Sequence, residues 1–306
     1  MTNVNMHEHW AIIRAKVTRG LLAAPLACLV VFNALDAARL DAQLIRAKDG
    51  VPLPAFDVAS VKQNNSGSDG THVLSKDAGY SVENLPLREI LKIAYGAKSD
   101  AQITGGPAAI LRNRYDIEAK IDEEQFTQIK TMSSGDRRRQ ISLMLQALLA
   151  DRFHLAVNFQ PKELPVYDLV LAKGGPKFHP SVTASSSHQG LSSRANSKKA
   201  EATAYEDKAL DGLTRLLSTQ PEVGDRTVVN KTGLSGKYDW SLHWARENND
   251  AVVTPGGSAA QTAVDTEATG PELFTALEEQ LGLKLKPQKD DVETIVIDHI
   301  EPPSEN

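Results

Sequence analysis

Two aspartates occupy the same sequence context, Asp116 after Tyr115 and Asp239 after Tyr238. Two carboxylates of this kind could act as general acid and base, or share one proton, as in glycosidases and aspartic proteases. Each aspartate, however, alternates with the apolar residues of a predicted strand, so we expect both side chains to face solvent or a nearby lysine. The pattern therefore favours a structural role over a catalytic one.

The stretch at 231–237 reads Lys-Thr-Gly-Leu-Ser-Gly-Lys, and its first three residues match an element of penicillin-binding proteins and β-lactamases. Those enzymes also need a nucleophilic serine with a lysine three positions later, and no serine in this sequence has one. We therefore predict a turn in which the glycines supply positive φ angles. The alternative is an exposed loop that binds a partner, for which the candidate residues are Lys231, Gly233, Gly236 and Lys237.

The histidine spacing predicts no metal site. His154, His243 and His299 fall in predicted strands, but neither His-x-x-x-His nor His-Glu-x-x-His occurs. A phosphate-binding glycine loop, a nucleophile elbow and a dinucleotide fingerprint are also missing. We therefore predict no metal and no cofactor. An envelope hydrolase stays an alternative, with a site built from Asp239, Lys231 and His243 or His299 between two copies of a unit that is repeated in the chain.

The overall composition argues against several classes of partner. The formal charge is −5 and the isoelectric point is near 5.9, which does not suit a nucleic-acid-binding surface. Aromatic residues make up only 5% of the chain, so platforms that stack bases or sugars are not expected. The single cysteine, Cys28, excludes a disulfide framework within the chain.

The first 43 residues have the order of a secretory signal peptide. Arg14, Lys16 and Arg19 precede an apolar run at 21–35, and small residues follow it. The run is shorter than the roughly 18 to 20 apolar residues that a membrane-spanning helix needs. We expect an exported protein, periplasmic or extracellular, which contacts a membrane only if residues 21–35 remain as an uncleaved anchor. Residues 44–54, rich in proline at their end, are predicted to be a linker.

The elements that must position these residues occur twice along the chain. Ile90 and Leu213 are 123 residues apart, as are Tyr115 and Tyr238, and the offset grows to 128 further on. We interpret this as two tandem copies of a small strand-helix-strand-helix-strand-strand unit, at 55–180 and 201–306, with a linker at 181–200. The first copy has one extra strand near Phe56, and an insertion predicted to be mobile lies at 247–269. The fold class predicted is α+β, with helices on one face of each sheet.

Local patterns place some boundaries of these elements. Asn84 is predicted to be the N-cap of a helix with Pro86 in its first turn, and a second helix is predicted at 136–151. Strands are predicted at 153–159 and 166–171, with a break around the prolines at 161–165.

Five stretches are distinctive enough for comparison with known families: residues 56–62 (FDVASVK), 148–153 (LLADRF), 165–167 (PVY), 231–239 (KTGLSGKYD) and 296–306 (VIDHIEPPSEN). They resemble a soil-associated family of uncharacterised exported proteins that is expanded in Acidobacteria, and the resemblance covers residues 56–306. It implies no established activity. Related domains are fused to membrane metallopeptidases similar to the β-lactam sensor, which implies a sensing or interaction role outside the cytoplasm. The zinc motif of those peptidases is absent here, so their activity does not carry over.

The leading functional hypothesis from the sequence is an exported, non-enzymatic module that binds a periplasmic or envelope protein, peptide or other ligand. It would use the edges of its sheets, or the space between the two copies, because exposed edges permit strand addition. The alternatives are the envelope hydrolase and an extracytoplasmic sensor domain.

Overall fold

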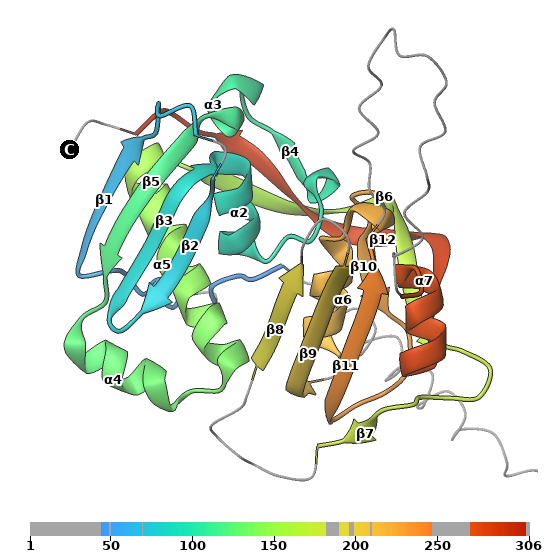
Figure 1. Ribbon diagram of the computed structural model, residues 1–306. Helices are drawn as coiled ribbons and strands as arrows, with labels where there is room; N and C mark the ends of the chain where they lie inside the picture. The colour runs from blue at the N-terminus through green and yellow to red at the C-terminus, as the bar shows by residue number, and fades with distance from the viewer. Residues whose placement is uncertain are drawn as a thin grey trace, which may run out of the picture. The chain divides into compact units, whose positions relative to one another are not determined.

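The computed structural model of the protein describes residues 44–48, 50–68, 70–181, 190–195, 199–208, 210–246 and 270–303, all within one compact unit, Ala38–Asn306 (Figure 1). The predicted signal peptide or anchor at 1–43 and the predicted insertion at 247–269 lie outside these residues. No helix in the described ranges combines the length and apolarity that a bilayer crossing requires. The described chain forms three four-stranded sheets with helices packed beside them, which confirms the α+β class.

Sheet A belongs to the N-terminal half and is antiparallel throughout, with the strand order β1, β5, β3, β2. Its buried face shares one hydrophobic core with helices α2 and α5. The second predicted helix is present and extends two residues beyond 136–151 at each end. The bounds are β1 (Val58–Gln63), β2 (His72–Lys76), β3 (Gly79–Pro86), α2 (Leu87–Tyr95), α3 (Ala108–Arg112), β5 (Arg114–Lys120), α4 (Glu123–Thr131) and α5 (Ser134–Phe153).

Sheet B is built around two long antiparallel strands, β6 (Ala156–Leu171) and β12 (Leu283–His299). They run as one ribbon from the side of sheet A to the side of the third sheet (Figure 1). Short parallel strands flank them, so that β10 (Thr227–Asn230) pairs with β6 and β4 (Ile103–Gly105) pairs with β12. The strand order is β10, β6, β12, β4.

The prediction of two strands separated at 161–165 is wrong, because β6 continues through Pro161 and Pro165 as one strand of 16 residues. β10 covers β6 only at 166–169, so the prolines lie where β12 is the sole strand beside β6 in the described residues. Pro287 likewise lies within β12, outside the three residues that β4 covers. Proline has no backbone N–H. On the open edge of a strand the missing N–H would point away from the paired strand, so no hydrogen bond of the sheet is lost.

Sheet C belongs to the C-terminal half, with the order β7, β11, β9, β8. This order corresponds to that of sheet A, and β7 pairs with β11 as β1 pairs with β5, so the strand predicted to be extra in the first copy has a counterpart. The duplication itself stays a prediction, which these matching orders support. The bounds are β7 (His179–Pro180), β8 (Gly190–Ala195), β9 (Lys199–Lys208), α6 (Asp211–Ser218), β11 (Lys237–Ala245) and α7 (Leu273–Ala276). The described residues also form two short 3-10 helices, η1 (Asp100–Gln102) and η2 (Pro221–Val223), and a π-helical turn η3 (Leu277–Leu281) after α7.

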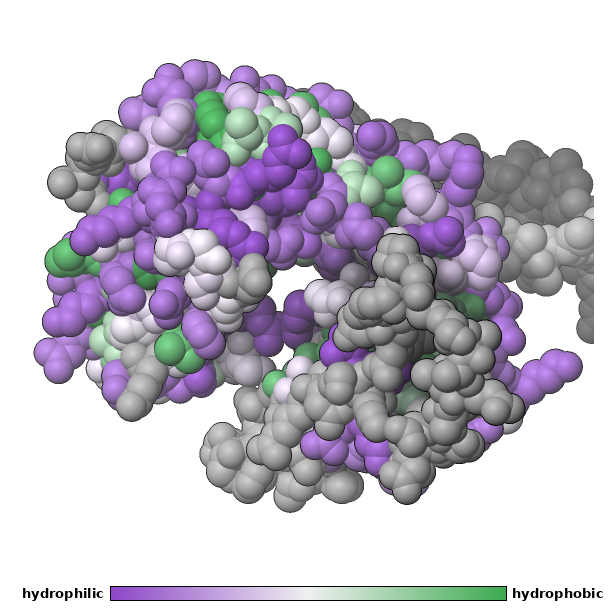
Figure 2. All heavy atoms as spheres, turned by 45° about the horizontal axis from the view of Figure 1, so that its top comes forward, coloured by the Kyte–Doolittle hydropathy of each residue, from purple (hydrophilic) through white to green (hydrophobic). Residues whose placement is uncertain are grey.

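Two main cores lie at the two ends of the long strands. The first unites sheet A, α2 and α5 with Ile295 and Ile297 of β12. The second unites sheet C, α6 and α7 with Leu169 of β6 and Leu283 of β12. Val157 and Phe159 of β6 also pack against the first core, so both long strands contribute to the stability of both ends. The face of the molecule in Figure 2 is mostly hydrophilic, with apolar residues in separate small patches.

Asn84 is not the N-cap of α2, whose N-cap is Pro86. It is 2% exposed, has a φ of 55°, and lies at an irregularity in the pairing of β3 with β5. Its side-chain amide donates to the carbonyls of Ser68 and Gly70 at 2.6 and 2.8 Å. Asparagine tolerates the left-handed conformation, and here it secures the loop before β2 rather than the helix.

Candidate functional site

The loop at 231–237 joins β10 to β11 and is stabilised by its own polar groups. The backbone N–H and the hydroxyl of Thr232 both donate to Asn230 Oδ1, at 2.9 and 2.7 Å. Gly233 and Gly236 have φ angles of 73° and 123°, and no atom lies within 4 Å of where a Cβ on Gly233 would be. The glycines are therefore needed for their backbone conformation and not for space. The loop has the conformation predicted for a glycine turn.

Lys231 and Lys237 lie at the two ends of this loop. The Lys231 backbone N–H donates to the carbonyl of Leu169 at 2.9 Å, and its Nζ lies 3.0 Å from Asp290 Oδ2. Lys237 opens β11, and its carbonyl accepts from the N–H of Ser181. The four predicted partner-binding residues are thus on one loop, and Lys231 ties that loop to sheet B.

Sequence reasoning missed the carboxylate beside Lys231. Asp168 on β6 lies opposite Lys286 of β12, and its buried Oδ1 has no hydrogen-bond partner among the described residues. Burial raises the pKa of the Asp168 carboxyl, and the negative charge of Asp290 adds to this, while Lys231 and Lys286 oppose it. We call Asp168, Lys231, Lys286 and Asp290 the Lys231 cluster.

One sequence signal could have identified Asp168. Leu164 and Val166 are buried and alternate along β6, and Asp168 is the next residue on the same face. An aspartate at a position that should be apolar breaks the alternating pattern of the strand, and such breaks are expected at functional sites.

The Lys231 cluster can take up or release a proton and can form ion pairs. A carboxyl group whose charge is disfavoured by burial takes up a proton more readily and then becomes a hydrogen-bond donor. The described residues contain no group of three or more His, Cys, Asp or Glu side chains that could hold a metal ion. The carboxylates and lysines of the cluster can form hydrogen bonds and ion pairs with a polar or charged group.

The residues of the hydrolase alternative have separate partners. Asp239 accepts a hydrogen bond from the hydroxyl of Ser181. The ring of His243 lies 3.6 Å from Glu201, and that of His299 lies 3.0 Å from Glu301. None of these contacts joins two members of the proposed set.

Asp116 also has a structural partner, which corrects the expectation that it faces solvent or a lysine. Its carboxylate accepts from the side-chain amide of Asn64 at 2.8 Å and from the backbone N–H of Asn84 at 2.7 Å. It thereby connects the end of β1 to the irregular part of β3. Asp116 and Asp239 each hold neighbouring segments together, which agrees with the structural interpretation of the pair.

The edge of sheet A carries exposed apolar side chains. One row of paired residues crosses the sheet from Val61 through Ile117 and Val82 to Val73 on β2. The first three are 3%, 0% and 1% exposed, whereas Val73 is 44% exposed. Leu74, on the opposite face, is 61% exposed. No other strand in the described residues pairs with the outer edge of β2, so the apolar row ends uncovered.

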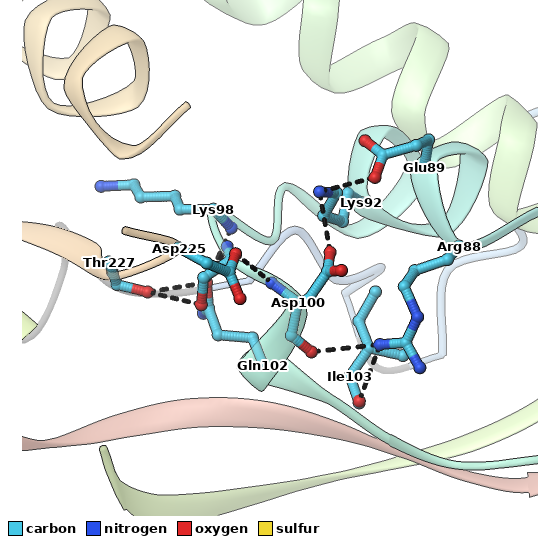
Figure 3. Close-up of polar contacts among 10 residues, drawn as sticks. Arg88, Glu89, Lys92, Lys98, Asp100, Gln102, Ile103, Asp225 and Thr227 are labelled. Atoms are coloured by element: carbon cyan, nitrogen blue, oxygen red, sulfur yellow. Dashed lines mark hydrogen bonds and ion pairs between the residues drawn. The ribbon is translucent and has the colours of Figure 1, made fainter. Parts of the chain in front are cut away.

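A buried polar junction joins the two halves of the molecule (Figure 3). Gln102 Oε1 accepts from the backbone N–H of Lys98 at 2.7 Å and from the hydroxyl of Thr227 at 3.2 Å. Ser99 and Thr227 hydroxyls lie 3.1 Å apart, and Asp225 accepts from the N–H of Asp100 at 2.8 Å. Gln102, Ser99 and Thr227 are each 1% exposed, so this network is structural.

Comparison with known proteins gives a family without an assigned activity. Neither the curated proteins nor the solved structures contain a match to this sequence. The model of a family described as a protein of unknown function, DUF3738, matches residues 88–300, which is more than half of the chain. The match runs from α2 to the end of β12 and so includes both long strands of sheet B. The chain therefore belongs to the DUF3738 family.

Proposed function

We propose that this protein is an exported, non-enzymatic binding module of the cell envelope, which takes an extended segment of a partner protein as an added strand beside β2. The observation that carries the proposal is the apolar row of sheet A, which ends at the half-exposed Val73 on an open edge. An added strand would complete that row and would also pair with the outward backbone groups of β2.

The contrast between the open edges of the molecule supports this choice. The open stretches of β6 and β12 contain Pro161, Pro165 and Pro287, and proline discourages the pairing of a further strand. β2 contains no proline and presents Val73 and Leu74 instead. A sheet edge that is unprotected and apolar is a template for strand addition.

The partner expected at β2 is an extended protein segment with an apolar residue placed to lie beside Val73. In strand addition the main chain supplies affinity, while alternate side chains supply specificity. The loop at 231–237, with Lys231 and Lys237, is the second surface of the proposal, where the partner's charged groups would meet the Lys231 cluster. No observation on the described residues specifically favours the hydrolase or the sensor alternative.

The test is a capture experiment from envelope extract with the full chain as bait. We expect the Val73→Lys, Leu74→Lys double variant no longer to capture a stoichiometric partner. It places a charge on each face of the edge strand, and charges on an edge strand oppose the pairing of a further strand. Ser193→Lys on β8, the corresponding edge of sheet C, is the matched control and should retain the partner.

A third bait, Lys231→Ala with Lys237→Ala, tests the loop surface. Loss of the partner in this bait alone would move the binding surface from β2 to the loop. The same partner retained by all three baits would contradict both surfaces.

A further inference from the structure

Residues 44–48 are held in place although the sequence predicts a linker there. Leu44 is 5% exposed and belongs to the first core. Its backbone N–H donates to Glu293 Oε2 at 2.9 Å, and the N–H of Ile45 donates to the carbonyl of Tyr95 at 2.7 Å. We call residues 44–46 the strap, because this segment crosses from α2 to β12.

Arg46 fixes the other end of the strap. Its guanidinium forms an ion pair with Glu293 and lies 4.1 Å from the centre of the Phe159 ring. A cation over an aromatic face and a charge-assisted hydrogen bond are each stronger than their neutral equivalents. The carbonyl of Arg46 accepts from Arg139 of α5 at 2.7 Å. Arginine at this position therefore contributes charge, ring contact and a backbone acceptor.

The helices beside the strap provide partners for its backbone. Gln146 of α5 donates to the carbonyls of both Ile45 and Ala94, at 2.9 and 2.8 Å, so one buried amide serves the strap and α2 together. Gly96, the C-cap of α2, has a φ of 70°, and a Cβ there would lie 3.1 Å from a side-chain carbon of Ile45. A larger residue at 96 would crowd the strap.

The chain between the strap and β1 contributes little to this docking. Val51 is 56% exposed, and its N–H bonds only to the nearby carbonyl of Lys48. Pro52 and Pro54 follow within an exposed or half-exposed stretch. The strap is therefore held by its own contacts and not by the connection to sheet A.

We propose that the surface where α2, α5 and β12 meet is a binding site for an extended Leu-Ile-Arg segment, which this chain fills with its own residues 44–46. The site recognises an apolar side chain followed two residues later by an arginine, through the first core and Glu293 respectively. The strap also sets the limit for proteolytic removal of the N-terminal region: the chain can be cut before Leu44 without loss of the site, but a cut after Arg46 releases its occupant.

The test uses the full chain with a specific protease site inserted between Gly50 and Val51, both exposed. After cleavage and removal of the released N-terminal piece, we expect Tm to fall by about 4 °C. Addition of a synthetic peptide with the sequence of residues 44–49 should restore the lost Tm. The same peptide with Arg46→Ala should bind about tenfold more weakly, since it loses the charge-assisted contact.

An unchanged Tm after cleavage, or failure of the peptide to bind the cleaved protein, would overturn the proposal. Variants of the uncut chain give a second measurement in case cleavage leads to unfolding. Glu293→Gln should make the segment before β1 more accessible to limited proteolysis. Glu163→Gln removes an exposed partner of Lys289 and is the matched control on the neighbouring strand, which should leave the digestion pattern unchanged.

Discussion

At the scale of single residues, the Asp168 side chain lowers the stability of the folded protein when its carboxyl group is charged. Burial raises the pKa of its carboxyl above the value in the unfolded chain. The cost is therefore absent below the unfolded pKa of about 4, appears as pH rises, and is complete above the folded pKa. A residue retained at a cost in stability is a candidate for function.

We predict that Asp168→Asn raises the free energy of unfolding at pH 7, because an amide has no charge to desolvate. The gain should shrink as pH is lowered and vanish well below about 4, where the wild-type carboxyl is protonated in both states. Urea unfolding at the two pH values measures it, with exposed Asp291→Asn as the control. A gain that is the same at both pH values would contradict the burial argument.

Residue types predicted the loop at 231–237 well, since two glycines in seven residues specify a turn by local conformation alone. They did not predict the Lys231 cluster, because Asp168, Lys286 and Asp290 come together only through the pairing of β6 with β12. Asn84 was misassigned for a related reason. Its side chain donates a hydrogen bond to a loop 14 residues away and does not cap the adjacent helix. The pattern of a single sequence does not show that contact.

At the scale of elements, the polar junction between η1 and β10 is the contact that depends most on one side chain. Gln102 Oε1 accepts from Lys98 N–H, Ser99 N–H and the Thr227 hydroxyl, and its Nε2 donates to the carbonyl of Glu293. Its removal would leave several buried polar groups without partners.

Gln102→Ala should therefore lower the free energy of unfolding by about 3 kcal/mol. Arg88→Ala, which removes donors to the carbonyls of Asp100 and Ile103 at a more exposed place, should cost about 1 kcal/mol and serves as the control. Chemical denaturation of both variants measures the difference. Equal losses would mean that water replaces the glutamine in the junction.

The prediction of the elements failed most clearly at β6. Prolines at 161 and 165 normally indicate a break, and the sequence contains nothing that says which edge of the strand is open. The helices α2 and α5 were predicted more reliably than the strand ends, because their apolar spacing is a local property whereas strand length depends on distant partners.

At the scale of the whole molecule, the two long strands should couple the cores at their ends. Trp240 and Trp244 lie buried on β11 in the second core, whereas Ile117 is buried on β5 in the first. If β6 and β12 transmit the loss of one core to the other, the described unit unfolds in a single transition.

We predict that Ile117→Ala lowers the denaturation midpoint of tryptophan fluorescence together with that of far-UV circular dichroism, at a cost of about 3 kcal/mol. Val58→Ala at the exposed start of β1 should leave both midpoints nearly unchanged. Two separated transitions, with the tryptophan signal unaffected by Ile117→Ala, would show that the halves unfold independently.

The ribbon of β6 and β12 also limits how the gene can recombine. Each half of the gene encodes one of the two strands. Each strand forms its backbone hydrogen bonds with the other along most of its length. A recombination event that transferred one half alone would deliver a product with a long unpaired strand, which is prone to aggregate. Inheritance should therefore keep the two halves together, and the family match at 88–300 includes both long strands.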